Sequence, residues 1–200
     1  MITIIDYGLG NLGSVANVLS KLSIPYQISA EIEAIQQASV LILPGVGAAG
    51  EGMKNLKRKG LDKLILEQVK KGTPILGICL GMQLLLSASD EGNVACLNLV
   101  KGRVKKFVTN LKVPQIGWNE VQAKPKSKLL NGLNKNTYFY FVNSYYCDLE
   151  NKDVITGVTS YGQDFCSVLE IKNIYGVQFH PEKSGKMGLK LIKNFCEEVC

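Results

Sequence analysis

The chain has few of the residues that build metal sites, disulfide frameworks and nucleic-acid surfaces. It contains one histidine, one tryptophan and two arginines, Arg58 and Arg103, among 200 residues. Its six cysteines stand at positions 79, 96, 147, 166, 196 and 200 and include no Cys-x-x-Cys pair. We therefore expect no metal site and no disulfide framework, and this cysteine usage fits a reducing cytoplasm.

Long apolar runs and targeting features are also absent. No run reaches the ~20 residues that a membrane-spanning helix needs, so we expect no membrane segment. The N-terminus begins directly with a strand-like run at residues 2–5, without the basic head, apolar core and cleavage site of a secretory signal. These features favour a cytoplasmic location.

The positive charge of the chain is modest and comes mostly from lysine. Lys and Arg number 23 against 17 Asp and Glu, which gives a formal net charge of +6 at pH 7. Nucleic-acid binding would favour an arginine-rich stripe interleaved with aromatic residues, and none is present. We therefore expect no nucleic-acid partner, and an acidic protein is the more economical partner for the excess charge.

The two halves of the chain differ in pattern. In the first half, strand-like runs at residues 2–5, 26–28, 40–43 and 75–78 alternate with helix-period segments at 12–22, 31–37, 51–69 and 79–86. This alternation predicts an α/β fold with an open, mostly parallel central sheet flanked by helices. The second half offers strands at 101–108, 115–121, 138–142, 154–160 and 165–171, and then a last helix at 185–199. It predicts a mixed, antiparallel β-rich region.

The chain has the size and composition of one domain. With 46% hydrophobic residues and no linker, repeat or low-complexity stretch, it is expected to form a single domain over residues 1–200. Ligands of open α/β sheets bind at the carboxyl ends of the strands. Four segments directly follow expected strands, so we expect them at this same edge of the sheet. They are residues 8–11, residues 45–47, Cys79 and His180.

Cys79 stands between two glycines where a strand is expected to end and a helix to begin. Residues 77–83 read Gly-Ile-Cys-Leu-Gly-Met-Gln and follow the apolar run 74–76. On such an elbow the helix dipole and free backbone N–H groups favour a thiolate, so Cys79 is a candidate nucleophile. A buried structural cysteine is the alternative, since most free cysteines are of that kind.

His180 is the only candidate for a base that titrates near neutrality. Residues 175–182 read Tyr-Gly-Val-Gln-Phe-His-Pro-Glu, and strand alternation places Gln178 and His180 opposite the apolar face. Pro181 favours extended backbone at His180, so Glu182 projects the same way as the imidazole. A carboxylate beside an imidazole is a base with its orienting group. A structural histidine is the alternative, which the elbow at Cys79 weakens.

The cysteine elbow and the His-x-Glu pair together resemble the class I glutamine amidotransferases, whose Cys, His and Glu hydrolyse glutamine. The likeness covers nearly the whole chain and includes Leu-Pro-Gly-Val-Gly at 43–47, Gln-Ile-Gly-Trp-Asn at 115–119 and Tyr-Phe-Val-Asn-Ser-Tyr-Tyr at 140–146. These motifs look like the glutaminase subunits of imidazole glycerol phosphate synthases, which serve histidine biosynthesis. The resemblance implies L-glutamine as substrate, no cofactor, and a heterodimer with a synthase or cyclase subunit that receives ammonia.

The resemblance, together with the place of each residue in the sequence, suggests roles for individual residues. Cys79 would attack the glutamine carboxamide, with His180 and Glu182 completing the triad. The N–H donors expected for the oxyanion hole come from Leu80 and from Gly45, Val46 and Gly47, a loop whose glycines would let a peptide turn away without the partner. Substrate binding falls to Gln83, one helical turn beyond Cys79, and to Glu91, Ser144 and Tyr145. The candidate partner contacts are Asn11, Trp118 and Lys183.

Three positions depart from the family pattern. Gln115, Ile116 and Asn143 stand where Pro-His-Met-Gly-Trp-Asn and Val-His-Ser-Tyr would place His, Met and His. The triad is untouched, but the ammonia acceptor is left open between a (β/α)₈ cyclase and another synthase. The alternative is a paralogous glutaminase subunit that supplies a sugar amidotransferase for surface polysaccharide.

Two further alternatives belong to other classes. Residues 8–13 read Gly-x-Gly-x-x-Gly after the first expected strand, and Glu31 follows at about the spacing of a dinucleotide-binding domain. Such a short glycine pattern is a weak signal without its structural context. The other alternative is a cysteine hydrolase or chaperone-like protein with Cys79 on the same kind of sheet. Only Glu182 and the Pro-Gly-Val-Gly loop at 44–47 argue against it.

Overall fold

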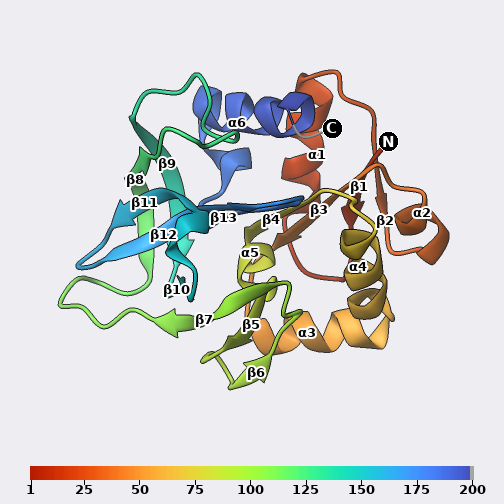
Figure 1. Cartoon of the computed structure of the whole chain (residues 1–200), viewed down its shortest axis with the longest axis horizontal. Helices are drawn as coiled ribbons and strands as arrows, with labels where there is room; N and C mark the ends of the chain where they lie inside the picture. Colours follow the sequence, from red (N-terminus) through yellow and green to blue (C-terminus); the bar gives the residue numbers. More distant parts are fainter. Residues whose placement is uncertain (199–200) are drawn as a thin grey trace.

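The computed structural model describes residues 1–198, whose strands form one 13-stranded mixed sheet with helices on both faces (Figure 1). Five neighbouring strands run parallel in the order β2-β1-β3-β4-β13. They are β1 (Ile2–Ile5), β2 (Tyr26–Ser29), β3 (Val40–Gly45), β4 (Ile75–Cys79) and β13 (Ile174–Val177). Strands β1, β3, β4 and β13 are buried along their whole length, as expected for a sheet covered on both faces. The predicted α/β fold is confirmed.

Helices cover the two faces of the parallel strands. In Figure 1, α1 (Leu12–Lys21) and α6 (Gly185–Glu198) lie on one side, and α3 (Ala49–Arg58) and α4 (Leu61–Lys70) on the other. The short α2 (Ile32–Gln36) packs against α4. The single helix expected at 51–69 is wrong, because Gly60 adopts a left-handed φ of 69° and separates α3 from α4. The expected end of the last helix at Val199 lies outside the described residues.

The second half is mostly antiparallel, as predicted. Its strands are β5 (Leu86–Ser89), β6 (Val94–Ala95), β7 (Val100–Lys106), β8 (Gln115–Ala123), β9 (Asn136–Asn143), β10 (Tyr145–Leu149), β11 (Ile155–Ser160) and β12 (Asp164–Ile171). Strands β8 and β9 form a long hairpin, and β5 with β7 is a parallel pair. Strands β5, β6 and β10 were not predicted. The elbow helix α5 (Leu80–Leu84) ends two residues before its expected end at Leu86, where β5 begins.

The parallel register brings several loops to one edge of the sheet. Gly45 at the end of β3 pairs with Cys79 at the end of β4, and Ile78 pairs with Val177 of β13. Because these neighbouring strands point the same way, the segments that follow them emerge together. The described chain has no helix of the length and apolarity that a membrane crossing requires.

Candidate active site

Cys79 lies on a sharp turn between β4 and α5. Its φ of 54° and ψ of −109° are unusual for a residue with a side chain, and such strain costs on the order of 1–3 kcal/mol unless the surroundings enforce it. Gly81 permits the turn, because a Cβ atom there would lie 1.7 Å from the Leu43 carbonyl oxygen. The cysteine elbow inferred from the sequence is thus present, with β3 packed directly against it.

His180 and Glu182 form a buried ion-pair contact. Nδ1 of His180 lies 2.8 Å from Oε1 of Glu182, and each side chain is only 3% exposed. The strand expected over 175–182 is shorter than predicted, because β13 ends at Val177. The 3₁₀ turn η2 (Pro181–Lys183) follows after His180. Lys183 N–H bonds back to the His180 carbonyl in this turn. The imidazole and the carboxylate therefore meet through a turn instead of along a strand.

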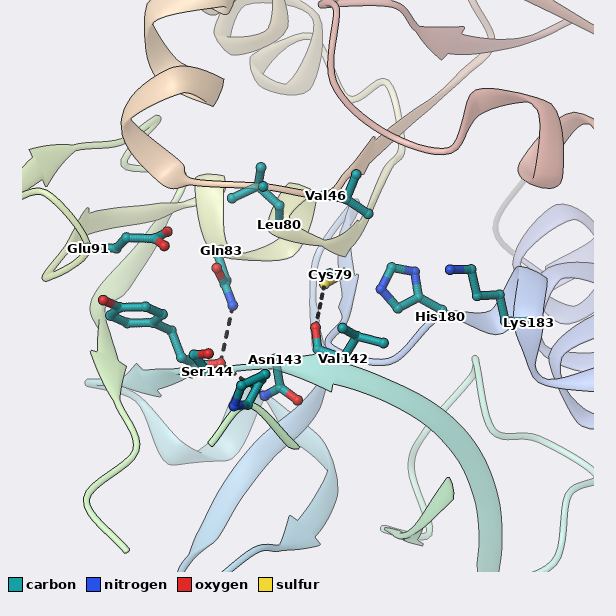
Figure 2. Close-up of a pocket in the computed structure, with 13 residues that line it drawn as sticks. Val46, Cys79, Leu80, Gln83, Glu91, Val142, Asn143, Ser144, His180 and Lys183 are labelled. Carbon is teal, nitrogen blue, oxygen red and sulfur yellow. Dashed lines mark hydrogen bonds between the residues drawn. The ribbon is translucent and has the colours of Figure 1, made fainter. Parts of the chain in front are cut away.

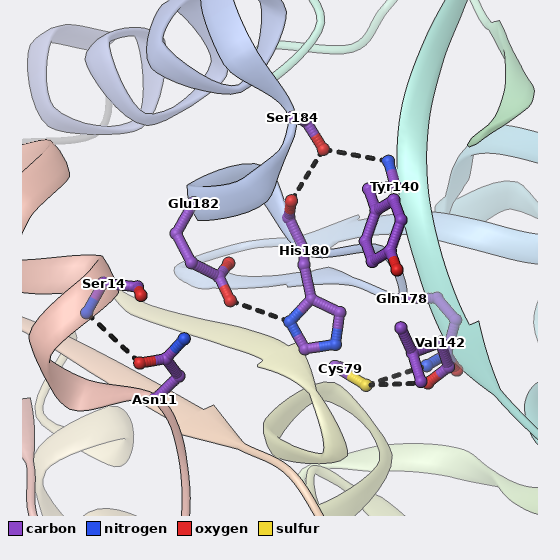
Figure 3. Close-up of polar contacts among 9 residues, drawn as sticks. All are labelled: Asn11, Ser14, Cys79, Tyr140, Val142, Gln178, His180, Glu182 and Ser184. Carbon is purple, nitrogen blue, oxygen red and sulfur yellow. Dashed lines mark hydrogen bonds and ion pairs between the residues drawn. The ribbon is translucent and has the colours of Figure 1, made fainter. Parts of the chain in front are cut away.

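The imidazole of His180 lies between the Glu182 carboxylate and the Cys79 sulfur (Figure 3). Because Nδ1 is held by the carboxylate, Nε2 is the nitrogen left for the sulfur. Burial disfavours the imidazolium, but the hydrogen bonds with Cys79 and Glu182, together with their charges, raise the pKa of His180 to about 10. The arrangement therefore favours a protonated imidazole beside the sulfur.

The Cys79 sulfur has two further polar neighbours. It lies 3.9 Å from the Val142 carbonyl oxygen of β9 and 3.7 Å from Nε2 of Gln178 (Figure 3). Neither Val142 nor Gln178 is among the site residues predicted from the sequence. The alternation of residues 175–180 had placed Gln178 on the His180 face, and that signal could have identified it. No sequence signal marked the Val142 carbonyl.

A cleft of about 300 Å³ opens at the cysteine (Figure 2). It brings together ten of the residues predicted for the site: Val46, Gly47, Cys79, Leu80, Gln83, Glu91, Ser144, Tyr145, His180 and Lys183. Pro114, Val142 and Asn143 also line it and were not predicted. Gly45 does not line the cleft, because it is buried in β3, where an added Cβ would lie 2.4 Å from the Tyr7 hydroxyl oxygen.

Two residues predicted to bind substrate also hold the walls of the cleft. Gln83 is 6% exposed, and its Nε2 donates to the Tyr145 carbonyl at 3.3 Å and to Oε1 of Gln178 at 3.0 Å. Glu91 accepts the backbone N–H of Ala49, the first residue of α3, at 2.8 Å. A carboxylate at a helix start complements the helix dipole. Glu91 thus fixes the chain just beyond the loop at 45–47.

The predicted partner residues lie in different settings. Lys183 is exposed at the cleft. Trp118 is 56% exposed on β8, with its ring 6.1 Å from that of Tyr140, so it is not a core residue. The side chain of Asn11 accepts the Ser14 N–H and caps α1.

The glycine run at 8–13 does not have the packing of a dinucleotide fingerprint. The third glycine of that motif serves close packing of a helix on a strand. Here Gly13 lies in α1, and a Cβ added to it would have no atom within 4 Å. Within residues 1–198, no three His, Cys, Asp or Glu side chains gather as a metal site.

The chain is similar to known proteins over nearly its whole length. Residues 3–199 match the family model of class-I glutamine amidotransferases. The chain is 47% identical over 199 residues to the imidazole glycerol phosphate synthase subunit HisH of Moorella thermoacetica, covering 99% of this chain and 95% of that protein. It is also 47% identical over 202 residues to subunit HisH 2 of Methanococcus maripaludis, covering 100% of both.

Solved structures show the same fold. A crystal structure of a glutamine amidotransferase has a TM-score of 0.79 at 16% identity and covers 99% of this chain and 98% of that one. The structure of PurLQS from Thermotoga maritima has a TM-score of 0.78 at 15% identity, with 100% and 98% covered. The resemblance inferred from the motifs is confirmed, and full-length HisH relatives do not favour the sugar amidotransferase alternative. The chain belongs to the class I glutamine amidotransferase family.

Proposed function

We propose that the chain is the glutaminase subunit of an imidazole glycerol phosphate synthase. It hydrolyses L-glutamine to glutamate and ammonia and passes the ammonia to a cyclase subunit in histidine biosynthesis. The observation that carries the proposal is the row of thiol, imidazole and carboxylate at one cleft in a chain of this family. We place it in the cytoplasm as a single-domain subunit of a heterodimer.

The triad divides the chemistry among three residues. The Cys79 sulfur attacks the carboxamide carbon of glutamine, and the His180 imidazolium gives its proton to the leaving ammonia. Water then attacks the γ-glutamyl thioester, with His180 as its base, and glutamate leaves. Glu182 keeps the proton of Nδ1 directed at its carboxylate, so Nε2 exchanges protons with the reacting atoms. The raised pKa of His180 suits it to hold the first proton.

The oxyanion is assigned to two backbone segments beside the sulfur. Leu80 follows the nucleophile directly, and its N–H opens α5. Val46 and Gly47 line the cleft and are exposed, and Gly47 has a φ of 106° that only glycine adopts readily. The loop is free to turn a peptide N–H toward or away from the cleft, and partner binding would set its direction. One lost oxyanion donor raises the barrier by about 2.7 to 4 kcal/mol.

Substrate contacts are assigned to residues that line the same cleft. Gln83, Glu91 and Ser144 lie on the side of the cleft away from Lys183 (Figure 2). Tyr145 also lines the cleft. The Glu91 carboxylate provides a negative charge for the α-ammonium group of glutamine. The remaining residues offer amide, hydroxyl and backbone groups for the polar atoms of the amino acid.

The cyclase subunit is expected to cover the mouth of the cleft. Large apolar side chains are exposed on the outer face of the β8–β9 hairpin at Ile116 (62%), Trp118 (56%) and Tyr138 (56%). Exposed tryptophan and tyrosine are typical of binding hot spots. Lys183 at the cleft and Asn11 after β1 complete the assigned contacts. A closed contact would carry neutral ammonia away from water, which would protonate it.

The proposal is tested with Cys79→Ala in the assembled synthase. Glutamine-dependent product formation should be lost, while synthesis from added ammonium salt should continue at the wild-type rate. Cys96→Ala replaces a half-buried free cysteine outside the cleft and should change neither activity. Loss of both activities in Cys79→Ala would contradict the division of labour, and retained glutamine use would contradict the nucleophile.

A further inference from the structure

Gln178 is a fully buried polar residue that the proposed mechanism does not use. Its side chain is 0% exposed, and its backbone N–H bonds to the Ser167 carbonyl of β12 at 3.0 Å, one residue beyond β13. Both ends of its amide have partners. Oε1 lies 3.0 Å from Nε2 of Gln83, and Nε2 lies 3.7 Å from the Cys79 sulfur.

The orientation of this amide follows from its neighbours. The Tyr145 carbonyl can only accept, so the end of Gln83 that faces it must be the NH₂ group. The same NH₂ group faces Gln178, which must therefore present its oxygen to Gln83. This leaves the NH₂ group of Gln178 on the sulfur. The Tyr145 carbonyl thus sets the direction of two amides in series, and a donor is directed at Cys79.

The two neighbours of the sulfur favour different states of it. The Val142 carbonyl accepts from a neutral S–H group but repels a thiolate. The amide N–H of Gln178 donates, and hydrogen bonds to charged groups are stronger than those to neutral groups. We propose that Gln178 is a further catalytic residue, which stabilises the Cys79 thiolate by hydrogen bonding from a side other than that of His180.

The inference rests on the proposed function and deepens it, because it also connects substrate binding to the nucleophile. Gln83 lines the cleft, whereas Gln178 lies behind it. A glutamine that engages Gln83 therefore contacts the residue that orients the donor on the sulfur. One hydrogen-bonded chain runs from the Tyr145 carbonyl through Gln83 and Gln178 to Cys79. This chain links the residue that contacts the substrate, Gln83, to the nucleophile.

The test measures thiolate reactivity without substrate or partner. The full chain is treated with iodoacetamide at pH 7, and alkylation of the Cys79 peptide is followed by mass spectrometry. Gln178→Met keeps the shape of the side chain but has no donor, and it should slow alkylation about tenfold. Gln178→Glu places an acceptor against the sulfur and should slow it further. Gln68→Met is the matched control, since Gln68 is 3% exposed on α4, away from the cleft.

A double-mutant cycle tests whether Gln83 acts on Cys79 through Gln178, or whether each substitution disturbs the structure independently. Gln83→Met frees the Gln178 amide to rotate and should also slow alkylation, and Gln83→Met with Gln178→Met should be no slower than Gln178→Met alone. Alkylation unchanged in both Gln178 variants would overturn the inference, as would additive losses in the double variant. In the assembled synthase, Gln178→Met should lower kcat for glutamine more than it changes KM.

The two proposals fail in distinguishable ways. A wild-type synthase complex without glutaminase activity would contradict the proposed function, while slower alkylation in Gln178→Met would still support the hydrogen bond to the thiolate. Full glutaminase activity in the wild type, with alkylation unaffected by Gln178→Met, would overturn the role of Gln178 and leave the proposed function standing. Stability is checked by urea unfolding, in which Gln178→Met and Gln68→Met should lower the free energy of unfolding by similar amounts.

Discussion

His180 Nδ1 and Glu182 Oε1 lie 2.8 Å apart in a region where both side chains are shielded from water. Since His180 is the only histidine, one imidazole signal in a ¹⁵N or ¹³C NMR titration reports its protonation. Burial opposes protonation, but Cys79 and Glu182 outweigh it, so the wild-type pKa should be about 10. Cys79→Ala should lower this pKa, and the double variant with Glu182→Gln should lower it further. A pKa that stays unchanged in Cys79→Ala would contradict the contact with the sulfur.

The same contact predicts how stability depends on pH. The folded pKa of His180 lies above the value of about 6.5 for an unfolded histidine, so the folded state binds the proton more tightly. This stabilisation is fully present near pH 6 and is lost as the pH rises from about 6.5 to about 10. The difference in unfolding free energy between wild type and Glu182→Gln, measured in urea, should shrink across that range. A difference that grows with pH would have the wrong sign.

Gly81 should be intolerant of any side chain. Gly81→Ala would place a methyl group against the Leu43 carbonyl and should lower the unfolding free energy by at least about 1–3 kcal/mol, as overpacking does. Gly13→Ala is the control, because Gly13 lies in α1 with open space around it. That change should stabilise by up to about 1 kcal/mol. Similar losses in both variants would show that the elbow is not tightly packed.

Glu91 should contribute separately to stability and to substrate binding. Glu91→Ala removes the acceptor of the Ala49 N–H and should cost about 1 kcal/mol in urea unfolding. Glu91→Gln keeps an oxygen acceptor but not the charge, so it should remain stable and raise KM for glutamine at least about tenfold. A stable Glu91→Gln variant with an unchanged KM for glutamine would contradict the role of Glu91 in substrate binding.

Trp118 should be a hot spot for the cyclase subunit. Trp118→Ala removes an exposed ring and should weaken the complex by about 2 kcal/mol or more, a roughly 30-fold higher Kd by calorimetry. Ile28→Ala is the control, because Ile28 is 43% exposed on β2 at the far edge of the sheet. An equal effect of both changes would argue against the β8–β9 face as the contact.

Local rules in the sequence predicted the fold and the elbow, whereas the family resemblance alone assigned Glu91, Ser144 and Tyr145 to the site. The apolar run at 74–76 and the glycines around Cys79 identified the elbow. Strand alternation and the short spacing put His180 and Glu182 together. The missed features depend on contacts across the chain. Val142 reaches the sulfur with a backbone oxygen, which no residue type reveals. Strand β6 was missed for another reason, because its two residues are too few to show a periodic pattern. Gln178 was on the correct face, but its partner Gln83 is 95 residues away.

Two interpretations failed for local reasons. The helical pattern of residues 51–69 continues on both sides of Gly60, so periodicity alone did not show that the backbone turns there. The pattern at 8–13 has the glycines of a nucleotide-binding turn, but Gly8 and Gly10 precede the N-cap of α1 and Gly13 lies in open space on the helix. In that loop Asn11 bonds to Ser14, a use of the side chain that the glycine spacing did not indicate.

The outer face of the β8–β9 hairpin leads directly to the catalytic cleft. Alternation puts Tyr138, Tyr140 and Val142 on one face of β9. Their cross-strand neighbours on the same face of β8 are Glu120, Trp118 and Ile116, in that order. Val142 also lines the cleft, and its carbonyl contacts the Cys79 sulfur. A protein that binds Trp118 would therefore also cover the cleft where ammonia is released. Binding of the partner and exclusion of bulk water from the ammonia would then occur in the same step.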